Sequence, residues 1–249
     1  LALTLLAGFY LNQLLKMSFA TRRPFEIDPA VARSQAAVET ALGSGFPSGH
    51  AQGSATFWAL AAAYVRRGWF TSLAVAVVAL VSLSRLYLGV HLPIDVVGGL
   101  AFGLATAGVA LWLQRREVTL GRPGAVLLGL VLPFGLHLLA PTANSDLLLG
   151  GLAAFAVGPE LIRHDTSGPV AGRVALSALA LVLVFGALLG SSALLPEEVK
   201  RAPVASFLRY LLIGGVGTVL VPWLGRVTRL TPRAARTPGD EPAARGTAA

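Results

Sequence analysis

The 249-residue sequence contains no cysteine. This absence excludes disulfide bonds, thiolate metal sites and a cysteine nucleophile, although it does not fix the redox compartment. Charged residues are also scarce: they make up 13% of the chain, against roughly 25% of an ordinary soluble domain. Because hydrophobic residues make up 55% of the chain, the composition indicates a membrane protein.

The apolar residues gather in eight blocks. A transmembrane helix needs about 20 mostly apolar residues to cross a hydrocarbon core about 30 Å thick. The blocks lack the alternation of β-barrel strands, and a helix satisfies its backbone polar groups within one segment. We therefore predict an all-α fold, a polytopic transmembrane helical bundle of about eight spans, at residues 1–15, 51–65, 70–90, 94–113, 125–140, 147–161, 174–195 and 207–224.

The two ends of the chain lead to separate expectations. The first block starts at Leu1 with no basic segment before it, so it does not look like an intact signal peptide, and we expect the first span to be truncated. Residues 226–249 are rich in Arg, Pro, Ala, Thr and Gly and have no apolar periodicity. We predict that this tail is disordered.

The positive charge follows the loops between the blocks. The formal net charge is +8, but the cations are scattered rather than gathered on a soluble face, so we expect no nucleic-acid partner. By the positive-inside rule the cytoplasmic side is the richer one, with Arg66, Arg67, Arg115, Arg116, Arg122, Arg163, Arg173 and the tail residues Arg226, Arg229, Arg233 and Arg236. The outward side has Lys16, Arg22, Arg23, Arg33, Arg85, Lys200 and Arg201.

Two short motifs lie on the outward side near the start of the chain. Lys16 is followed after six residues by Arg23 and Pro24, a pattern that also fits a basic membrane flank. Residues 47–50 read Pro-Ser-Gly-His before the second block, which places Ser48 as a helix N-cap and leaves free N–H groups that attract anions. A plain helix cap is the alternative.

A third motif joins the third and fourth blocks on the same side. It runs Ser84, Arg85, five residues, His91, three residues and Asp95, with Pro93 suited to the first turn of a helix. The i, i+4 interval permits a hydrogen bond between His91 and Asp95. A capping Asp beside an interfacial His is the alternative. Together the three motifs offer cations, two histidines and an aspartate without a plausible metal cluster, which indicates metal-free phosphoryl transfer.

These motifs resemble the signature of the type 2 phosphatidic acid phosphatase superfamily, K-x6-R-P, P-S-G-H and S-R-x5-H-x3-D, over roughly residues 12 to 113. The resemblance implies a phosphatase core at 1–113, additional transmembrane helices at 114–225 and the tail at 226–249. Membrane members of the family usually have two more spans before the first motif. The four spans after the core resemble the longer architecture of sphingosine-phosphate and glucose-phosphate phosphatases.

The resemblance also implies a role for each motif residue. His91 would be the nucleophile that forms a phosphohistidine, Asp95 would orient it, and His50 would be the general acid and then the base. The phosphate oxygens would be held by Lys16, Arg23, Ser48, Gly49 and Arg85. We expect no cofactor and no metal.

The predicted function is hydrolysis of a lipid phosphate or diphosphate at the outer face of the cell membrane, with membrane lipids as the partners. The alternatives are a non-catalytic lipid-phosphate binder or transporter and a vanadium-dependent haloperoxidase, which the eight apolar blocks disfavour. Phosphatidic acid, phosphatidylglycerol phosphate, undecaprenyl diphosphate and sphingosine phosphate all remain open as substrates.

Three further features receive predictions. His137 is an ionisable residue within a span, so it could line the site, although a structural role is favoured. Gly99 and Gly103 form a G-x-x-x-G pair that indicates a helix-packing surface. The weakly amphipathic run at 28–42 predicts a short interfacial helix over the site.

Overall fold

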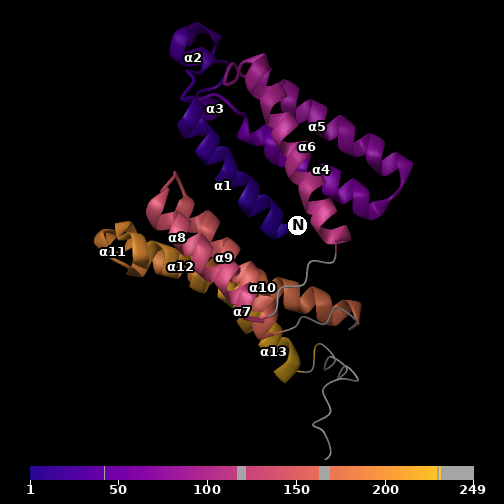
Figure 1. Cartoon of the computed structure of the whole chain (residues 1–249), viewed down its shortest axis with the longest axis vertical. Coiled ribbons are helices and arrows are strands. Elements are labelled where there is room, and N and C mark those ends of the chain that lie inside the picture. Colours follow the sequence, from indigo (N-terminus) through magenta and orange to yellow (C-terminus); the bar gives the residue numbers. More distant parts are fainter. Residues whose placement is uncertain (42, 117–121, 163–168, 229, 231–249) are drawn as a thin grey trace, which may run out of the picture.

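A computed structural model describes residues 1–41, 43–116, 122–162, 169–228 and 230, and Figure 1 shows the arrangement of its helices. All regular structure in these residues is helical, which confirms the predicted all-α fold. Each of the eight apolar blocks coincides with a helix. The predicted disordered tail at 226–249 starts too early, because the last helix continues to Val227. Arg163, Arg229, Arg233 and Arg236, and the rest of the tail from residue 231 onward, lie outside the described residues.

The first half of the chain forms four long helices and three short ones. The long helices are α1 (Ala2–Phe19), α4 (Gly49–Val65), α5 (Gly68–Tyr87) and α6 (Pro93–Arg115). The short ones, α2 (Pro24–Ile27), η1 (Pro29–Val31) and α3 (Gln35–Glu39), lie between α1 and α4. The predicted short helix within 28–42 is therefore present as α3, and Pro93 occupies the first turn of α6 as predicted.

The second half contains two helices that change their winding near a proline. The bounds are α7 (Arg122–Val126), η2 (Leu127–Val131), α8 (Leu132–Leu139), α9 (Ser145–Leu161), α10 (Val170–Leu194), α11 (Glu197–Arg201), α12 (Pro203–Gly215), η3 (Val216–Leu220) and α13 (Val221–Val227). The π-helical turns η2 and η3 end two residues before Pro133 and Pro222. Proline removes one backbone N–H donor, and a widened turn accommodates the carbonyl that this leaves without a helical partner.

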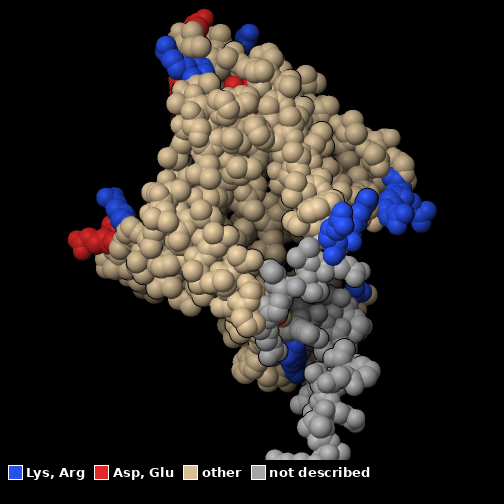
Figure 2. Space-filling model, in the orientation of Figure 1, with Lys and Arg blue, Asp and Glu red and all other residues tan. Residues whose placement is uncertain are grey.

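The surface of the helices is suited to lipid. Among the described residues, four helices are long and apolar enough to cross a membrane: α5, α6, α10 and the continuous helix Pro203–Val227. Pro123–Leu139 is a shorter apolar helix. Lys and Arg side chains gather at helix ends, and an uncharged belt lies between them (Figure 2). Long apolar side chains such as Leu80 and Leu83 of α5 are exposed, and together with the apolar helices they make the chain a membrane protein.

Helix α1 lies between the two halves of the molecule (Figure 1) and contacts both. One side of α1 packs on α4 and α6, and another packs on α9. The contact with the second half contains buried apolar residues from α1, α9 and α12, namely Tyr10, Leu148, Leu149, Ala153 and Phe207. The helix that carries Lys16 is therefore held by both halves.

Helices α4 and α6 approach each other closely because α6 presents glycine at the contact. A Cβ atom at Gly99 would lie 2.5 Å from the Ser48 carbonyl oxygen, and one at Gly103 would lie 2.5 Å from the Gln52 carbonyl oxygen. Both distances are too short for a side chain, which confirms the predicted packing role of this glycine pair. The contact places the second motif, on α4, beside the third, on α6.

Gly103→Ala is expected to destabilise the protein, whereas Gly108→Ala on the same helix is not. The added methyl group at Gly103 would meet the α4 backbone, and overpacking of this kind costs about 1–3 kcal/mol. At Gly108 a Cβ atom meets open space, so alanine should be neutral or should favour the helix by up to about 1 kcal/mol. Thermal unfolding in detergent measures the midpoint of each variant. Equal midpoints for Gly103→Ala and Gly108→Ala would contradict the packing role of Gly103.

Candidate active site

His91 lies in the short connection between α5 and α6, and the connection is shaped by Gly89. Gly89 has a φ of +70°, and its Cα approaches the Val31 carbonyl too closely to allow a side chain. The Arg33 N–H donates to the Leu88 carbonyl at 3.3 Å, which ties the connection to the chain after η1. These contacts bury His91, which is 5% exposed.

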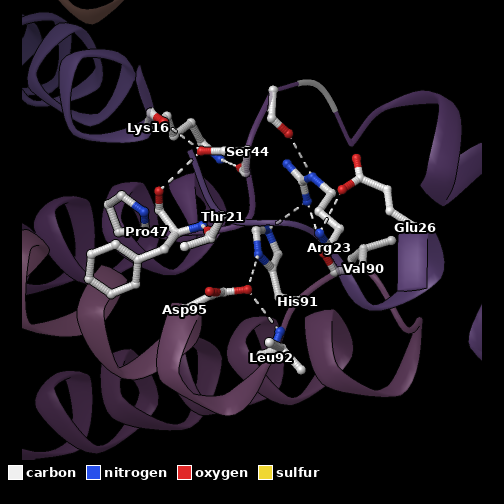
Figure 3. Close-up of polar contacts among 12 residues, drawn as sticks. Lys16, Thr21, Arg23, Glu26, Ser44, Pro47, Val90, His91, Leu92 and Asp95 are labelled. Atoms are coloured by element: carbon white, nitrogen blue, oxygen red, sulfur yellow. Dashed lines mark hydrogen bonds and ion pairs between the residues drawn. The ribbon is translucent and has the colours of Figure 1, made fainter. Parts of the chain in front are cut away.

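The imidazole of His91 has a polar partner on each side (Figure 3). Its Nδ1 lies 3.3 Å from Asp95 Oδ2, and its Nε2 lies 3.3 Å from Nη1 of Arg23. A guanidinium can only donate, so Nε2 is the acceptor and carries the lone pair, while Nδ1–H donates to the carboxylate. The arrangement fixes the tautomer in which Nε2 is the nucleophilic nitrogen.

Asp95 joins the second and third motifs. Its Oδ2 also accepts the Leu92 N–H at 2.8 Å, which caps the first turn of α6. Its backbone carbonyl accepts the Ser48 N–H at 2.9 Å. Because Asp95 is 1% exposed, its carboxylate is held away from water behind His91. The predicted contact between His91 and Asp95 is present.

Arg23 connects three separate segments through its side chain (Figure 3). Nη1 donates to the Val90 carbonyl and Nε donates to the Gly43 carbonyl, each at 2.9 Å. Its backbone N–H donates to the Glu26 carboxylate at 2.7 Å. The guanidinium is therefore positioned before any ligand arrives, with one nitrogen against His91.

Lys16 lies in the last turn of α1 and is 7% exposed. Its ammonium donates to the Ser44 carbonyl, and the Ser44 hydroxyl donates to the Lys16 carbonyl at 2.7 Å. Next to this pair, the Gly45 and Phe46 N–H groups donate to the backbone and side-chain oxygens of Thr21 at 2.9 and 2.7 Å. The first motif is thereby fastened to the segment that leads into the second.

The second motif behaves differently from the prediction at one residue. Ser48 occupies the N-cap position of α4, but its side chain makes no capping hydrogen bond, and its buried hydroxyl has no partner. Ser48 therefore occupies the predicted N-cap position without the predicted capping hydrogen bond, and its backbone N–H donates to the Asp95 carbonyl at 2.9 Å. Gly49 fits closely against Asn12: a Cβ atom there would lie 3.2 Å from the Asn12 Oδ1. His50 is exposed.

The motifs meet at a cavity of about 560 Å³. Six of the eight predicted site residues line it: Lys16, Arg23, Gly49, His50, Arg85 and His91. Ser48 and Asp95 are not part of its lining and lie behind it, almost fully buried. An apolar part of the lining consists of Phe9, Phe57, Trp58 and Val81. The cavity thus joins a cationic end to an aromatic one.

Asn12 is a site residue that the motifs did not identify. It lines the cavity, and its Nδ2 donates to the Pro47 carbonyl at 3.2 Å and to Gln52 Oε1 at 2.8 Å. Gln52 Nε2 in turn donates to the Gly8 carbonyl at 2.8 Å. Asn12 therefore holds the second motif against α1. The sequence alone could have indicated Asn12, because it is a polar residue in an apolar block and lies one helical turn before Lys16.

His137 has the structural role that was favoured for it. Its Nδ1 lies 3.0 Å from the Ser145 hydroxyl, and its Nε2 lies 2.9 Å from the Pro203 carbonyl oxygen. Since a carbonyl only accepts, Nε2 donates the proton and Nδ1 accepts from Ser145. The ring does not line the cavity and joins α8, α9 and α12 instead.

Two family models match the chain. One, described as the PAP2 superfamily, matches residues 1–118, and the other, described as the PAP2 superfamily phosphatase, transmembrane extension, matches residues 142–233. No curated protein and no solved structure gives a significant match. Within the described residues, no group of three or more His, Asp or Glu side chains is arranged to hold a metal ion.

The surroundings of His91 keep its imidazole neutral. Burial is the largest cause, followed by the charges of Arg23 and Lys16, and together they lower the pKa of His91 from 6.5 to about 3. At neutral pH the ring therefore carries no proton on Nε2. A neutral imidazole beside two cations is suited to attack an electrophile that brings its own negative charge.

This low pKa predicts a loss of stability in acid. Below about pH 6.5 the unfolded chain protonates this histidine while the folded chain does not, so the free energy of unfolding falls as the pH drops from about 6.5 toward 3. The slope contributed by one such group is about 1.4 kcal/mol per pH unit. In detergent, the thermal midpoint of His91→Gln should decline less steeply between pH 6.5 and 4 than that of the wild type. Parallel curves would contradict the low pKa.

Proposed function

Because the chain belongs to the PAP2 superfamily, a family of phosphatases, and also matches that family's transmembrane extension, we propose that it is an integral-membrane phosphatase acting on a lipid phosphate or lipid diphosphate. The observation that carries the proposal is the cavity in which cationic and aromatic side chains meet. Each end of this cavity suits one part of a phosphorylated lipid.

The aromatic end supports a lipid tail rather than a soluble leaving group. Phe9 from α1 and Phe57 from α4 line the cavity, and each is 38% exposed. The cavity therefore reaches the apolar surface of the bundle, where an acyl chain can leave the site and enter the bilayer. Burial of apolar surface favours such a tail by roughly 25 cal/mol per Å².

The cationic end supports a phosphate group. Lys16, Arg23 and Arg85 line it, and within the described residues the Arg85 side chain makes one hydrogen bond, to the neighbouring Ser84 hydroxyl at 3.2 Å. The N-terminus of α4 adds free N–H groups and the positive end of a helix dipole. The buried Ser48 hydroxyl without a partner is a further donor behind the site. Such donors neutralise the charge on the equatorial oxygens in phosphoryl transfer.

The first chemical step uses the lone pair fixed on His91. Nε2 attacks phosphorus and the bond from phosphorus to the lipid oxygen breaks. His50, which is protonated when the negative charge of the bound phosphate offsets the surrounding cations, gives its proton to the leaving oxygen. Arg23 Nη1, which lies against Nε2, would turn to the phosphate oxygens as the substrate enters. Asp95 stabilises the positive charge that develops on the imidazole through the Nδ1–H contact.

The second step returns the site to its starting state. His50, now neutral, takes a proton from water, the water oxygen attacks phosphorus, and the bond from phosphorus to Nε2 breaks with its electron pair returning to nitrogen. Inorganic phosphate leaves and His50 is protonated again. The residues alone carry every proton in this cycle, so the proposal includes no metal and no cofactor.

Purified protein in detergent should release phosphate from at least one of phosphatidic acid, phosphatidylglycerol phosphate, undecaprenyl diphosphate and sphingosine phosphate. It should do so faster than from glucose phosphate and without loss when EDTA is added. His91→Ala should lower turnover by at least about 10³-fold, because the nucleophile is removed. A colorimetric phosphate assay measures each rate.

The control for that variant is Gln114→Ala, which removes an exposed polar side chain that lies near the other end of α6 and does not line the cavity. It should retain phosphohistidine formation with a radiolabelled lipid phosphate, whereas His91→Ala should form none. Near-normal turnover by His91→Ala would overturn the nucleophile. Binding of the lipids without release of phosphate from any of them would favour the non-catalytic binder.

We also propose that the site faces outward. The cavity lies toward one end of the first four long helices, and Arg66 and Arg115 together line a depression at their other end. Arg67 and Arg116 follow them in the sequence and are exposed. By the positive-inside rule this arginine-rich end is cytoplasmic.

Cysteine labelling tests this orientation, because the chain has no cysteine of its own. In intact cells a membrane-impermeant maleimide should label Glu39→Cys, on the exposed end of α3, and should label Arg67→Cys only after the membrane is opened. The reverse pattern would place the site on the cytoplasmic side.

A further inference from the structure

The cavity receives one part of its wall from the second half of the chain. Ala143 and Asn144, in the connection between α8 and α9, line it together with His91. These two residues fall within the match to the transmembrane extension. Resting on the function proposed above, we infer that the 141–144 loop is a specificity-determining wall, which contacts the uncharged polar part of the lipid leaving group next to the phosphate.

The loop is fastened at its first end by α1. The Tyr10 hydroxyl donates to the Ala140 carbonyl at 3.0 Å, and Tyr10 is 5% exposed. Tyr10 belongs to the same helix as Asn12 and Lys16, which line the cavity. The start of the loop is therefore fixed relative to the cationic end of the site.

The other end of the loop is fastened through His137. The ring connects the Ser145 hydroxyl to the Pro203 carbonyl on α12, and both His137 and Ser145 are buried. The Ser145 N–H donates to the Thr142 carbonyl at 3.1 Å, which closes the turn. A loop held at both ends by buried side chains presents a fixed surface to the cavity, as a specificity wall requires.

Asn144 is the residue of this loop equipped to contact a substrate. Its φ of +60° lies in the left-handed region, which asparagine adopts more readily than most residues other than glycine. Although it occupies the N-cap position of α9, its side chain makes no capping hydrogen bond. Its amide thus has both a donor and an acceptor available to the cavity that it lines.

The chemistry of this wall selects the class of ligand group. Residues 37–41 and 143–144 contribute only Ala37, Thr40, Ala41, Ala143 and Asn144 to the lining, and none of them is charged. A wall of this kind suits an ester, amide or hydroxyl group of the lipid. It provides no partner for a second ionised group on that side.

Two variants change the wall in opposite ways. Asn144→Gly removes the amide and keeps the positive φ accessible, because glycine adopts it without strain. Ala143→Phe adds bulk where the lipid would pass. The control is Asp146→Asn: its carboxylate accepts only the Leu147 N–H at 2.8 Å and does not line the cavity.

The readout is kcat/KM for the best lipid substrate divided by kcat/KM for para-nitrophenyl phosphate, a small soluble ester. Asn144→Gly should lower this ratio by about tenfold, as expected for one lost hydrogen bond. Ala143→Phe should lower it further, and Asp146→Asn should leave it unchanged. Gel filtration identifies a variant that fails to fold. If one of the two variants fails, the ratio measured with the other decides whether the inference holds.

An unchanged ratio in a folded Asn144→Gly or Ala143→Phe variant, with a wild type that hydrolyses lipid normally, would overturn this inference alone. An equal loss on both substrates would do the same, because it would place the effect at the phosphate. A wild type that releases phosphate from none of the lipids would instead contradict the proposed function, and the inference with it.

Discussion

The site depends on the hydrogen bonds that the Asp95 carboxylate accepts. It accepts from the His91 ring and from the Leu92 N–H, so the same oxygen orients the imidazole and starts α6. The backbone of the same residue holds Ser48 at the start of α4. A buried carboxylate is costly unless it is paired and hydrogen-bonded. Here the carboxylate accepts hydrogen bonds from the His91 Nδ1–H and the Leu92 N–H, so the cost of burying the charge is offset by the same contacts that orient the ring.

The features that sequence predicted well are those set by local pattern. The eight apolar blocks coincide with helices because hydrocarbon thickness and backbone hydrogen bonding leave little choice. The i, i+4 spacing of His91 and Asp95 produced the expected contact because residues four positions apart lie about one helical turn apart. The G-x-x-x-G pair correctly predicted a helix-packing surface, since both Gly99 and Gly103 pack against α4. The residue roles themselves stay predictions.

The features that sequence could not predict are contacts between distant segments. Tyr10 and Ala140 are 130 positions apart, and nothing in either neighbourhood indicates that they meet. The Ser48 hydroxyl appeared to be a capping group because only its position relative to α4 was known. The contact that Ser48 does make, from its backbone N–H to the Asp95 carbonyl, involves another helix, and its hydroxyl has no partner among the described residues. In the same way, the connection between α8 and α9 joined the cavity lining without any motif of its own.

The glycine contact between α4 and α6 has a consequence for motion. Helices whose backbones approach this closely cannot slide past each other without a clash, so the starts of α4 and α6, which carry His50 and Asp95, are held together as one frame. On the function proposed above, room for a phosphate beside His91 would come from the Arg23 side chain, which lies 3.3 Å from the ring, rather than from movement of this frame.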